Sequence, residues 1–251
     1  MIVAGSSSSI PRPDRACSSY VIDDGETPVV LDLGTGAFSR ARRHVGEDRI
    51  GAVIISHMHA DHFIDLIPLR YALRYGERQR AAKLPVYLPP GGAAMLRALV
   101  SAFAHEGGDF LGDVFELHEY DPHVPLRIGG ATIRFALTEH YIPAFAMRWE
   151  RNGASLTYSA DTAPSAAVVA LARECDLFVC EATLRHGACE TGMRGHSSAA
   201  EAATMARDAG VRRLMLTHYG EASGANDLDG PARETFAGEI TVADDHTVLA
   251  I

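Results

Sequence analysis

The chain has 251 residues, of which 47% are hydrophobic and 22% charged, so it is long enough to bury a sizeable core in one domain. Its formal net charge of −9 argues against a general nucleic-acid binder, because such proteins are usually basic. No apolar run approaches the roughly 20 residues of a membrane span, and no signal peptide is evident at the start, so we expect a cytoplasmic protein without a membrane partner.

The first half of the chain predicts strands that give way to helices. Apolar runs bounded by turn residues predict strands over 1–4, 17–22, 28–33, 50–56 and 85–88. The polar segment 37–48 is expected to be helical, helical spacing of the apolar residues predicts a helix over 63–80, and a further helix is expected over 93–105. The run over 50–56 is almost continuously apolar, as in a strand that is covered on both faces.

The second half repeats this order. Strands are predicted over 115–120, 126–128, 131–138, 145–149, 155–159, 176–180, 213–216, 240–243 and 247–251, and helices over 166–173, 197–209 and 231–236. Asn152-Gly153 indicates a hairpin, Ser197 a helix cap and Gly210 a helix end. The halves would meet near residue 130, but no flexible linker separates them. We therefore expect a single domain over residues 1–251.

Four potential metal ligands follow the apolar run 50–56 within six residues. They lie in the segment His57-Met58-His59-Ala60-Asp61-His62, expected on a loop at the carboxyl end of the strand. Neutral imidazoles and a carboxylate are ligands for Zn²⁺ or a related divalent ion. The alternative is a polar turn with solvated histidines, and the partners found later in the chain argue against it.

Three further candidate ligands stand after predicted strands: His140, Asp161 and His218. Counted together, the candidates suffice for two ions, one held by His57, His59 and His140 and the other by Asp61, His62 and His218. Asp161 could bridge the ions with one carboxylate oxygen on each. Structural zinc sites are closed and often rich in thiolates, whereas this set has no cysteine and has positions to spare, so the pattern favours catalysis.

These motifs resemble the metallo-β-lactamase superfamily, and more narrowly its RNase Z-like and small phosphodiesterase branch. Beyond the His-x-His-x-Asp-His motif, the similarity extends to further segments along almost the whole chain: Gly5-Ser6, Pro11-x-Pro13, Ser18-Ser19-Tyr20, Leu31-Asp32-Leu33-Gly34-Thr35-Gly36, His140-x-x-Pro143-Ala144-x-Ala146-x-Arg148, Glu181-Ala182-Thr183, Gly195-His196-Ser197 and Leu216-Thr217-His218-Tyr219. The resemblance implies an α/β fold, the four-layer αββα sandwich, with two mixed sheets flanked by helices.

The resemblance also assigns roles to residues near the candidate ligands. It implies that Glu181 orients His196, which would donate a proton to the leaving oxygen as general acid or hold a phosphate oxygen, while a metal-bound hydroxide attacks. The catalytic candidates are thus Asp61, His196 and Glu181. Alternatively, His196 only caps the following helix. Asp32 is expected either to bond the second nitrogen of a ligand histidine or to be a turn residue.

One departure from the family pattern bears on the substrate. RNase Z carries a glycine- and proline-rich arm that grips tRNA, and the segment between Asp161 and Glu181 is too short for one, so tRNA 3′-processing is disfavoured. We expect instead hydrolysis of a small phosphodiester, cyclic or nucleotide in type, by an enzyme with two divalent ions, Zn²⁺ first and Mn²⁺ or Fe as alternatives.

Several alternatives stay open on the sequence. A hydrolase of lactones, thioesters or carboxylic esters would use the same ions, and a non-enzymatic metal-binding protein is the remaining class. The substrate is expected to be small and anionic, and a homodimer is compatible with the sequence. Arg148 and Arg194 are candidates to contact the substrate, and His186 could line the cleft.

Overall fold

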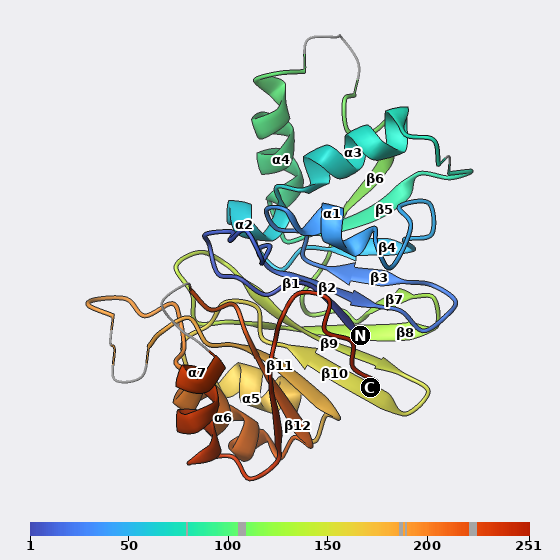
Figure 1. The fold of residues 1–251 in the computed structure, drawn as a ribbon. Coiled ribbons are helices and arrows are strands. Elements are labelled where there is room, and N and C mark those ends of the chain that lie inside the picture. Colours follow the sequence, from blue (N-terminus) through green and yellow to red (C-terminus); the bar gives the residue numbers. More distant parts are fainter. Residues whose placement is uncertain (79, 105–108, 186–187, 189, 221–224) are drawn as a thin grey trace.

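Two β-sheets lie face to face in the computed structural model, which describes residues 1–78, 80–104, 109–185, 188, 190–220 and 225–251 (Figure 1). Among these residues the first sheet has six strands, ordered in space as in sequence: β1 (Ile2–Gly5), β2 (Ser19–Ile22), β3 (Val29–Leu31), β4 (Ala52–Ile54), β5 (Leu84–Leu88) and β6 (Phe115–Glu119). β1 to β3 pair antiparallel and β3 to β6 parallel, so the sheet is mixed.

The second sheet has seven strands in the described part of the chain. Its order from edge to edge is β13 (Glu239–Val242), β12 (Arg213–Thr217), β11 (Leu177–Glu181), β10 (Ala154–Tyr158), β9 (Phe145–Arg151), β8 (Ala131–Leu137) and β7 (Leu126–Ile128). β10 to β13 are parallel, and β7 to β10 are joined antiparallel. The hairpin predicted at Asn152-Gly153 is confirmed, with φ of 52° and 83°.

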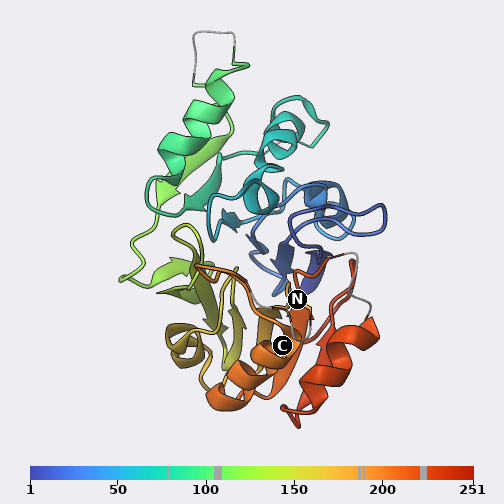
Figure 2. The ribbon, with the colours of Figure 1, turned by 90° about the vertical axis from the view of Figure 1, so that its left-hand side faces the viewer.

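Helices cover the outer face of each sheet, which gives the αββα layers that the resemblance implies (Figures 1 and 2). α1 (Ala37–Ala41), α3 (Leu66–Tyr75) and α4 (Gly92–Ser101) pack on the first sheet, and α5 (Ala166–Ala172), α6 (Ala199–Ala209) and α7 (Ala225–Arg233) on the second. Alternate residues of the central strands face opposite layers: Val53 joins the helix-covered core, whereas Ile54 joins the core between the sheets. This explains the continuous apolar run over 50–56.

The expected helix over 63–80 is wrong in its extent. The structure has a short helix, α2 (Ala60–Phe63), and then α3, so Asp61 and His62 are helical and not on a loop. Pro68 explains the break, because it has no N–H to donate to the preceding turn and is tolerated only in the first turn of a new helix. The carboxylate of Asp65 accepts the N–H of Phe38 and so ties the junction to α1.

Other boundaries differ by a few residues. Ser198, and not Ser197, caps α6, because it forms a capping box with Glu201, while the hydroxyl of Ser197 donates to the carbonyl of Thr162. Gly210 ends α6 at a φ of 65°, as predicted. The expected helix over 37–48 ends at residue 41, and the last helix begins before the expected residue 231.

The C-terminal segment also departs from the expectation. Residues 247–251 form no strand, although Val248 bridges to Ile2. The expected helix over 93–105 is wrong at its end, because α4 ends at Ser101 and residues 102–104 are not helical, while residue 105 lies outside the described residues. No helix within the described ranges is long and apolar enough to cross a membrane.

Candidate metal centre

The candidate ligands gather where strand ends of both sheets meet. His57 follows β4, and Asp61 and His62 lie in α2, all on the first sheet. His140 follows β8, Asp161 follows β10 and His218 follows β12, all on the second. Because β8, β10 and β12 run in the same direction, their carboxyl ends reach one edge of the sheet, opposite α2.

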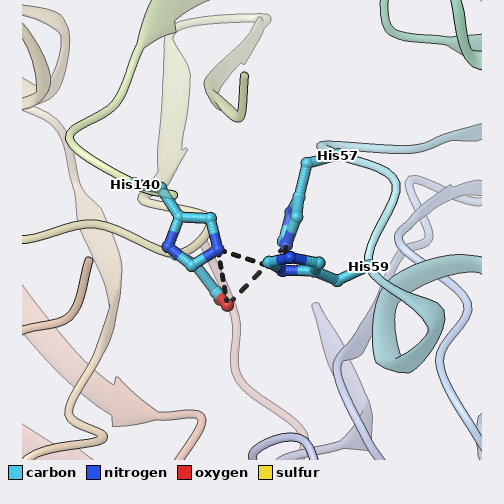
Figure 3. A group of neighbouring side chains, drawn as sticks. His57, His59 and His140 are labelled. Carbon is cyan, nitrogen blue, oxygen red and sulfur yellow. Dashed lines mark hydrogen bonds and ion pairs between the residues drawn. The ribbon is translucent and has the colours of Figure 1, made fainter. Parts of the chain in front are cut away.

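The first cluster contains three imidazoles, those of His57, His59 and His140 (Figure 3), together with the carboxylate of Asp161. His59 Nδ1 lies 3.2 Å from His57 Nε2 and 3.1 Å from His140 Nε2. Nitrogen ligands at 2.0–2.1 Å around a tetrahedral ion would be separated by about 3.3 Å. The three nitrogens are thus spaced as ligands of one small ion would be.

Neighbouring groups turn a lone pair of two of these histidines toward the centre. His140 Nδ1 donates to the carbonyl of Gly195 at 2.8 Å, which leaves Nε2 as the acceptor nitrogen. The hydroxyl of Ser56 gives its proton to Asp32, so at 3.0 Å it accepts from His57 Nδ1. Burial lowers the pKa of His57, His59 and His140 and keeps all three imidazoles neutral, as metal ligation requires.

The second cluster joins Asp61, His62 and His218 to the same Asp161, and all four residues are buried. Asp61 Oδ2 lies 3.5 Å from the Nε2 atoms of both His62 and His218. His218 Nδ1 donates to the hydroxyl of Thr183 at 2.8 Å, and that hydroxyl in turn donates to the carbonyl of His218. The Nε2 lone pair of His218 is therefore directed at the two carboxylates.

Asp161 faces both clusters, one oxygen to each. Its Oδ2 lies 3.7 Å from His57 Nε2 and 3.8 Å from His140 Nε2. Its Oδ1 lies 3.3 Å from His62 Nε2 and 3.5 Å from His218 Nε2. This is the placement that a carboxylate shared by two ions requires.

Two buried atoms indicate that the site is built for a cationic group. Within the described residues, His62 Nε2 and Asp161 Oδ1 are both buried without a hydrogen-bond partner, although such atoms are normally satisfied. Burial opposes ionisation of Asp161, yet the neighbouring imidazoles of His218 and His62 hold its pKa well below the usual range. The two clusters are consistent with a dinuclear metal site, and their donors fit divalent ions such as Zn²⁺.

Asp32, buried beside the second cluster, accepts four hydrogen bonds. Its Oδ1 accepts the N–H of Ser56 at 2.6 Å, and its Oδ2 accepts the Ser56 hydroxyl at 2.7 Å, His62 Nδ1 at 2.7 Å and the Tyr158 hydroxyl at 2.9 Å. Of the two readings of Asp32, the contact with a candidate ligand histidine is the one observed. Since Tyr158 belongs to the second sheet, Asp32 also joins the two sheets directly behind the site.

The backbone beside the ligands is held in uncommon conformations. Asp32, Ala160 and His218 have φ of 56°, 52° and 52°, a left-handed region that costs non-glycine residues energy and often marks functional sites. Gly34 approaches α2 so closely that an added Cβ would lie 1.8 Å from the Asp61 carbonyl oxygen. The loop after β3 thus fits only a glycine against the helix that carries Asp61 and His62.

His196 lies beside both clusters and bonds to Glu181. Its Nδ1 donates to Glu181 Oε1 at 2.9 Å, and the ring stacks on His218 with centroids 5.8 Å apart. The amide N–H groups of Thr162 and Thr183 also donate to Glu181, which fixes its carboxylate. Burial alone would lower the pKa of His196, but the bond to Glu181 and its charge outweigh this and raise the pKa to about 9.

The two arginines considered for substrate contact are already engaged. Arg148 donates to the carbonyls of Leu171 and Arg173 at the end of α5 and pairs with Glu150. Arg194 pairs with Glu201, and one of its nitrogens also donates to the carbonyl of His196 at 3.3 Å. His186 lies outside the described residues.

Sequence reasoning did not find Ser56, Tyr158 and Thr183 as partners of the candidate ligands. Ser56 directly precedes the histidine motif and Thr183 lies two residues after Glu181, so each could have been suspected from its neighbour. Tyr158 has no such signal, because it reaches Asp32 from the other sheet.

Comparison with known proteins finds a matching family model and similar sequences. A family model described as a beta-lactamase superfamily domain matches residues 27–219. An uncharacterized protein of Mycobacterium tuberculosis is 34% identical to this chain over 95% of it and 87% of the relative. A ribonuclease Z of Mycobacterium bovis is 31% identical over 96% of this chain and 94% of its own.

The Bacillus subtilis protein YhfI, described as a probable metallo-hydrolase, is 27% identical over 96% of this chain and 95% of its own. Its crystal structure, described as a metallo-beta-lactamase fold protein, superposes with a TM-score of 0.88 at 25% identity, covering 99% of this chain and 98% of that one. The likeness therefore covers both sheets and both sets of candidate ligands.

Proposed function

This chain belongs to the metallo-β-lactamase superfamily and is a metal-dependent hydrolase, and from that premise we propose that it is a phosphodiesterase acting on a small, anionic diester of the cyclic or nucleotide type. The observation that carries the proposal is the His196–Glu181 pair beside the two clusters. An alkoxide that leaves phosphorus is strongly basic and needs a proton, and a histidine with a pKa of about 9 holds that proton at neutral pH.

Each residue of the site has a part in this proposal. Two divalent ions, Zn²⁺ first and Mn²⁺ or Fe as alternatives, would supply Lewis acidity that activates water and offsets charge on the phosphoryl oxygens. His196 Nδ1 stays bonded to Glu181, so the proton that moves is on Nε2 and passes to the leaving oxygen as the P–O bond breaks. Asp61, held by His62 and His218, can accept a hydrogen bond from the attacking water.

A substrate panel on metal-quantified protein tests the proposal. It comprises bis(p-nitrophenyl) phosphate, a cyclic nucleotide, an aryl ester, a thioester, a lactone and a precursor tRNA. We expect turnover of the diesters, and we expect His196→Ala to slow cleavage of alkoxide-releasing diesters by about 10²–10⁴-fold with metal content unchanged. His123→Ala, which alters an exposed turn histidine, is the matched control. Full activity in His196→Ala would remove the general-acid role, and turnover of carbonyl esters alone would replace phosphodiesterase with esterase or lactonase activity.

A second candidate, tRNA 3′-processing, is favoured by the ribonuclease Z relative. Residues 162–180 oppose it, because they contain α5 and most of β11 and leave no length for a tRNA-gripping arm. The net charge of −9 opposes it too. Cleavage of precursor tRNA in the panel would decide for this candidate. We further propose a homodimer as the assembly to be tested, and light scattering on the purified protein measures it.

A further inference from the structure

Glu190 makes three hydrogen bonds next to the general-acid candidate, and the mechanism above does not use it. Its Oε2 accepts the N–H of Gly195 at 2.9 Å and that of His196 at 3.2 Å. Its Oε1 accepts the hydroxyl of Tyr141. One carboxylate thus joins the backbone that carries His196 to the residue that follows His140.

Tyr141 packs directly on this segment. An added Cβ on Gly195 would lie 2.5 Å from Cζ of Tyr141, so only a glycine permits the contact. The ring of Tyr141 lies 4.9 Å from that of His140 and 5.6 Å from that of His196, measured between centroids. Its side chain is 44% exposed, yet its hydroxyl is committed to Glu190.

Two glutamates therefore hold different parts of His196. Glu181 bonds Nδ1 and sets the direction of the ring. Glu190 accepts a hydrogen bond from the main-chain N–H of His196 and so fixes the position of the backbone that carries the ring. The carbonyl of Gly195 accepts from His140 Nδ1, so the same short segment also orients a candidate metal ligand. A shift of this segment would move the proton donor relative to the metal clusters.

We propose that Glu190 and Tyr141 form a latch that positions His196 for proton transfer to the leaving group. The inference rests on the proposed phosphodiesterase function and adds two positioning residues to it. General-acid catalysis needs the donor within about 2.6–3.2 Å of the leaving oxygen, and a displacement of about 1 Å can cost 10²-fold in rate. The latch is the only link between Tyr141 and the His196 main chain that the described residues provide through side-chain hydrogen bonds.

Two thymidine diesters that differ in the leaving group separate positioning from general damage. Thymidine 5′-(p-nitrophenyl phosphate) releases p-nitrophenolate, which leaves without a proton, whereas thymidylyl-thymidine releases an alkoxide that requires one. We expect Glu190→Ala to lower kcat about 10- to 100-fold on the dinucleotide and less than about 3-fold on the nitrophenyl ester, with KM little changed. Tyr141→Phe should give a smaller loss with the same preference.

Further variants complete the test. Glu190→Gln keeps an oxygen for the two amide N–H groups and serves if Glu190→Ala fails to fold. The double variant Glu190→Ala/Tyr141→Phe should lose no more than Glu190→Ala alone, because the two residues act as one unit. Glu150→Gln is the control. Glu150 lies on β9 and pairs with Arg134 of β8 and Arg148 of β9, so its substitution should leave the rate on both substrates unchanged.

The outcomes distinguish this inference from the function it rests on. Equal losses on both esters, or no loss on either, would overturn the latch while phosphodiesterase activity stands. A wild-type protein with measured metal content that cleaves neither these two diesters nor the diesters of the substrate panel would overturn the proposed function, and the latch with it.

Discussion

The two ligand clusters share Asp161 but differ in charge and burial. The first is made of three imidazoles, of which His59 and His140 are half-buried. The second is fully buried and adds the carboxylate of Asp61, with Asp32 immediately behind it. The difference shows in the histidines: burial lowers the pKa of His57, whereas for His62 the charges of Asp161 and Asp32 overcome the effect of burial and raise the pKa well above normal.

This contrast shows that the carboxylates around a histidine decide its protonation state before a metal ion binds. A histidine surrounded by other histidines is kept neutral, and its lone pair is available. A histidine between carboxylates instead holds a proton, which an ion must displace. Substitutions at Asp161, Asp32 and Glu181, together with a change of pH, test this difference between the clusters.

The largest effect is expected from removing what the clusters share. Asp161→Asn replaces one carboxylate oxygen by an NH2 group and removes the negative charge, so residue 161 can no longer offer an oxygen to both sites. We expect loss of bound metal and a fall in turnover of about 10³-fold or more, since each ion stabilises the transition state by several kcal/mol. Elemental analysis and diester hydrolysis measure it, with Asp121→Asn in an exposed turn as the control. Two retained ions in the variant would show that Asp161 is not shared.

Asp32→Asn should weaken metal binding in the two clusters to different extents. Asp32 bonds His62 directly but reaches His57 only through Ser56, so the second ion should bind about 10- to 100-fold more weakly and the first much less so. Stepwise removal by a chelator, followed by elemental analysis, gives both affinities. Equal weakening of the two ions would mean that Asp32 supports the site as a whole.

Acid should act on the second cluster first. Because the pKa of His62 in the metal-free protein is raised, its proton is present at neutral pH and must leave when the ion binds, so affinity should fall about tenfold per pH unit in the range where His62 is protonated. The first cluster, with lowered pKa values, should show this only at lower pH. Calorimetric titration in buffers of different ionisation enthalpy counts the protons released, and equal release by both ions would contradict the contrast.

The smallest effect concerns His196 and leaves both clusters loaded. A general acid works while protonated, so a pKa raised to about 9 keeps the rate up to that pH and lets it fall above. Glu181→Gln removes the charge that raises the pKa, and the alkaline limb of the pH–rate profile should move to lower pH. A profile that stays in place would assign that limb to another group.

Much of the fold and of the site was predictable because the signals are local. Apolar runs predicted most strands, since a strand that is buried on both faces is usually a continuous apolar run, as in β4 and in the first four residues of β11. The motif from His57 to His62 indicated a candidate metal site through the chemistry of its own side chains, and the structure gathers these side chains into the two clusters. The placement of one Asp161 oxygen toward each cluster agrees with the bridging role expected of it.

What escaped prediction depends on contacts between distant segments. Periodicity shows that Tyr158 is buried, but not that its hydroxyl meets Asp32 of the other sheet. The break between α2 and α3 depends on Pro68, and the helical spacing of the apolar residues around Pro68 hid this break from the sequence analysis. Glu190 and Tyr141 lie outside regular elements, where spacing carries no information about partners.

The distribution of the ligands along the chain also has a consequence during synthesis. Four of them emerge from the ribosome together, whereas His218 follows β12 near the end of the chain. A nascent chain therefore exposes the ligands of the first sheet long before those of the second sheet are synthesised. The second cluster cannot be complete until the second sheet has assembled. Choice of metal then belongs to the finished protein, because only the folded chain presents both carboxylate and imidazole donors in register.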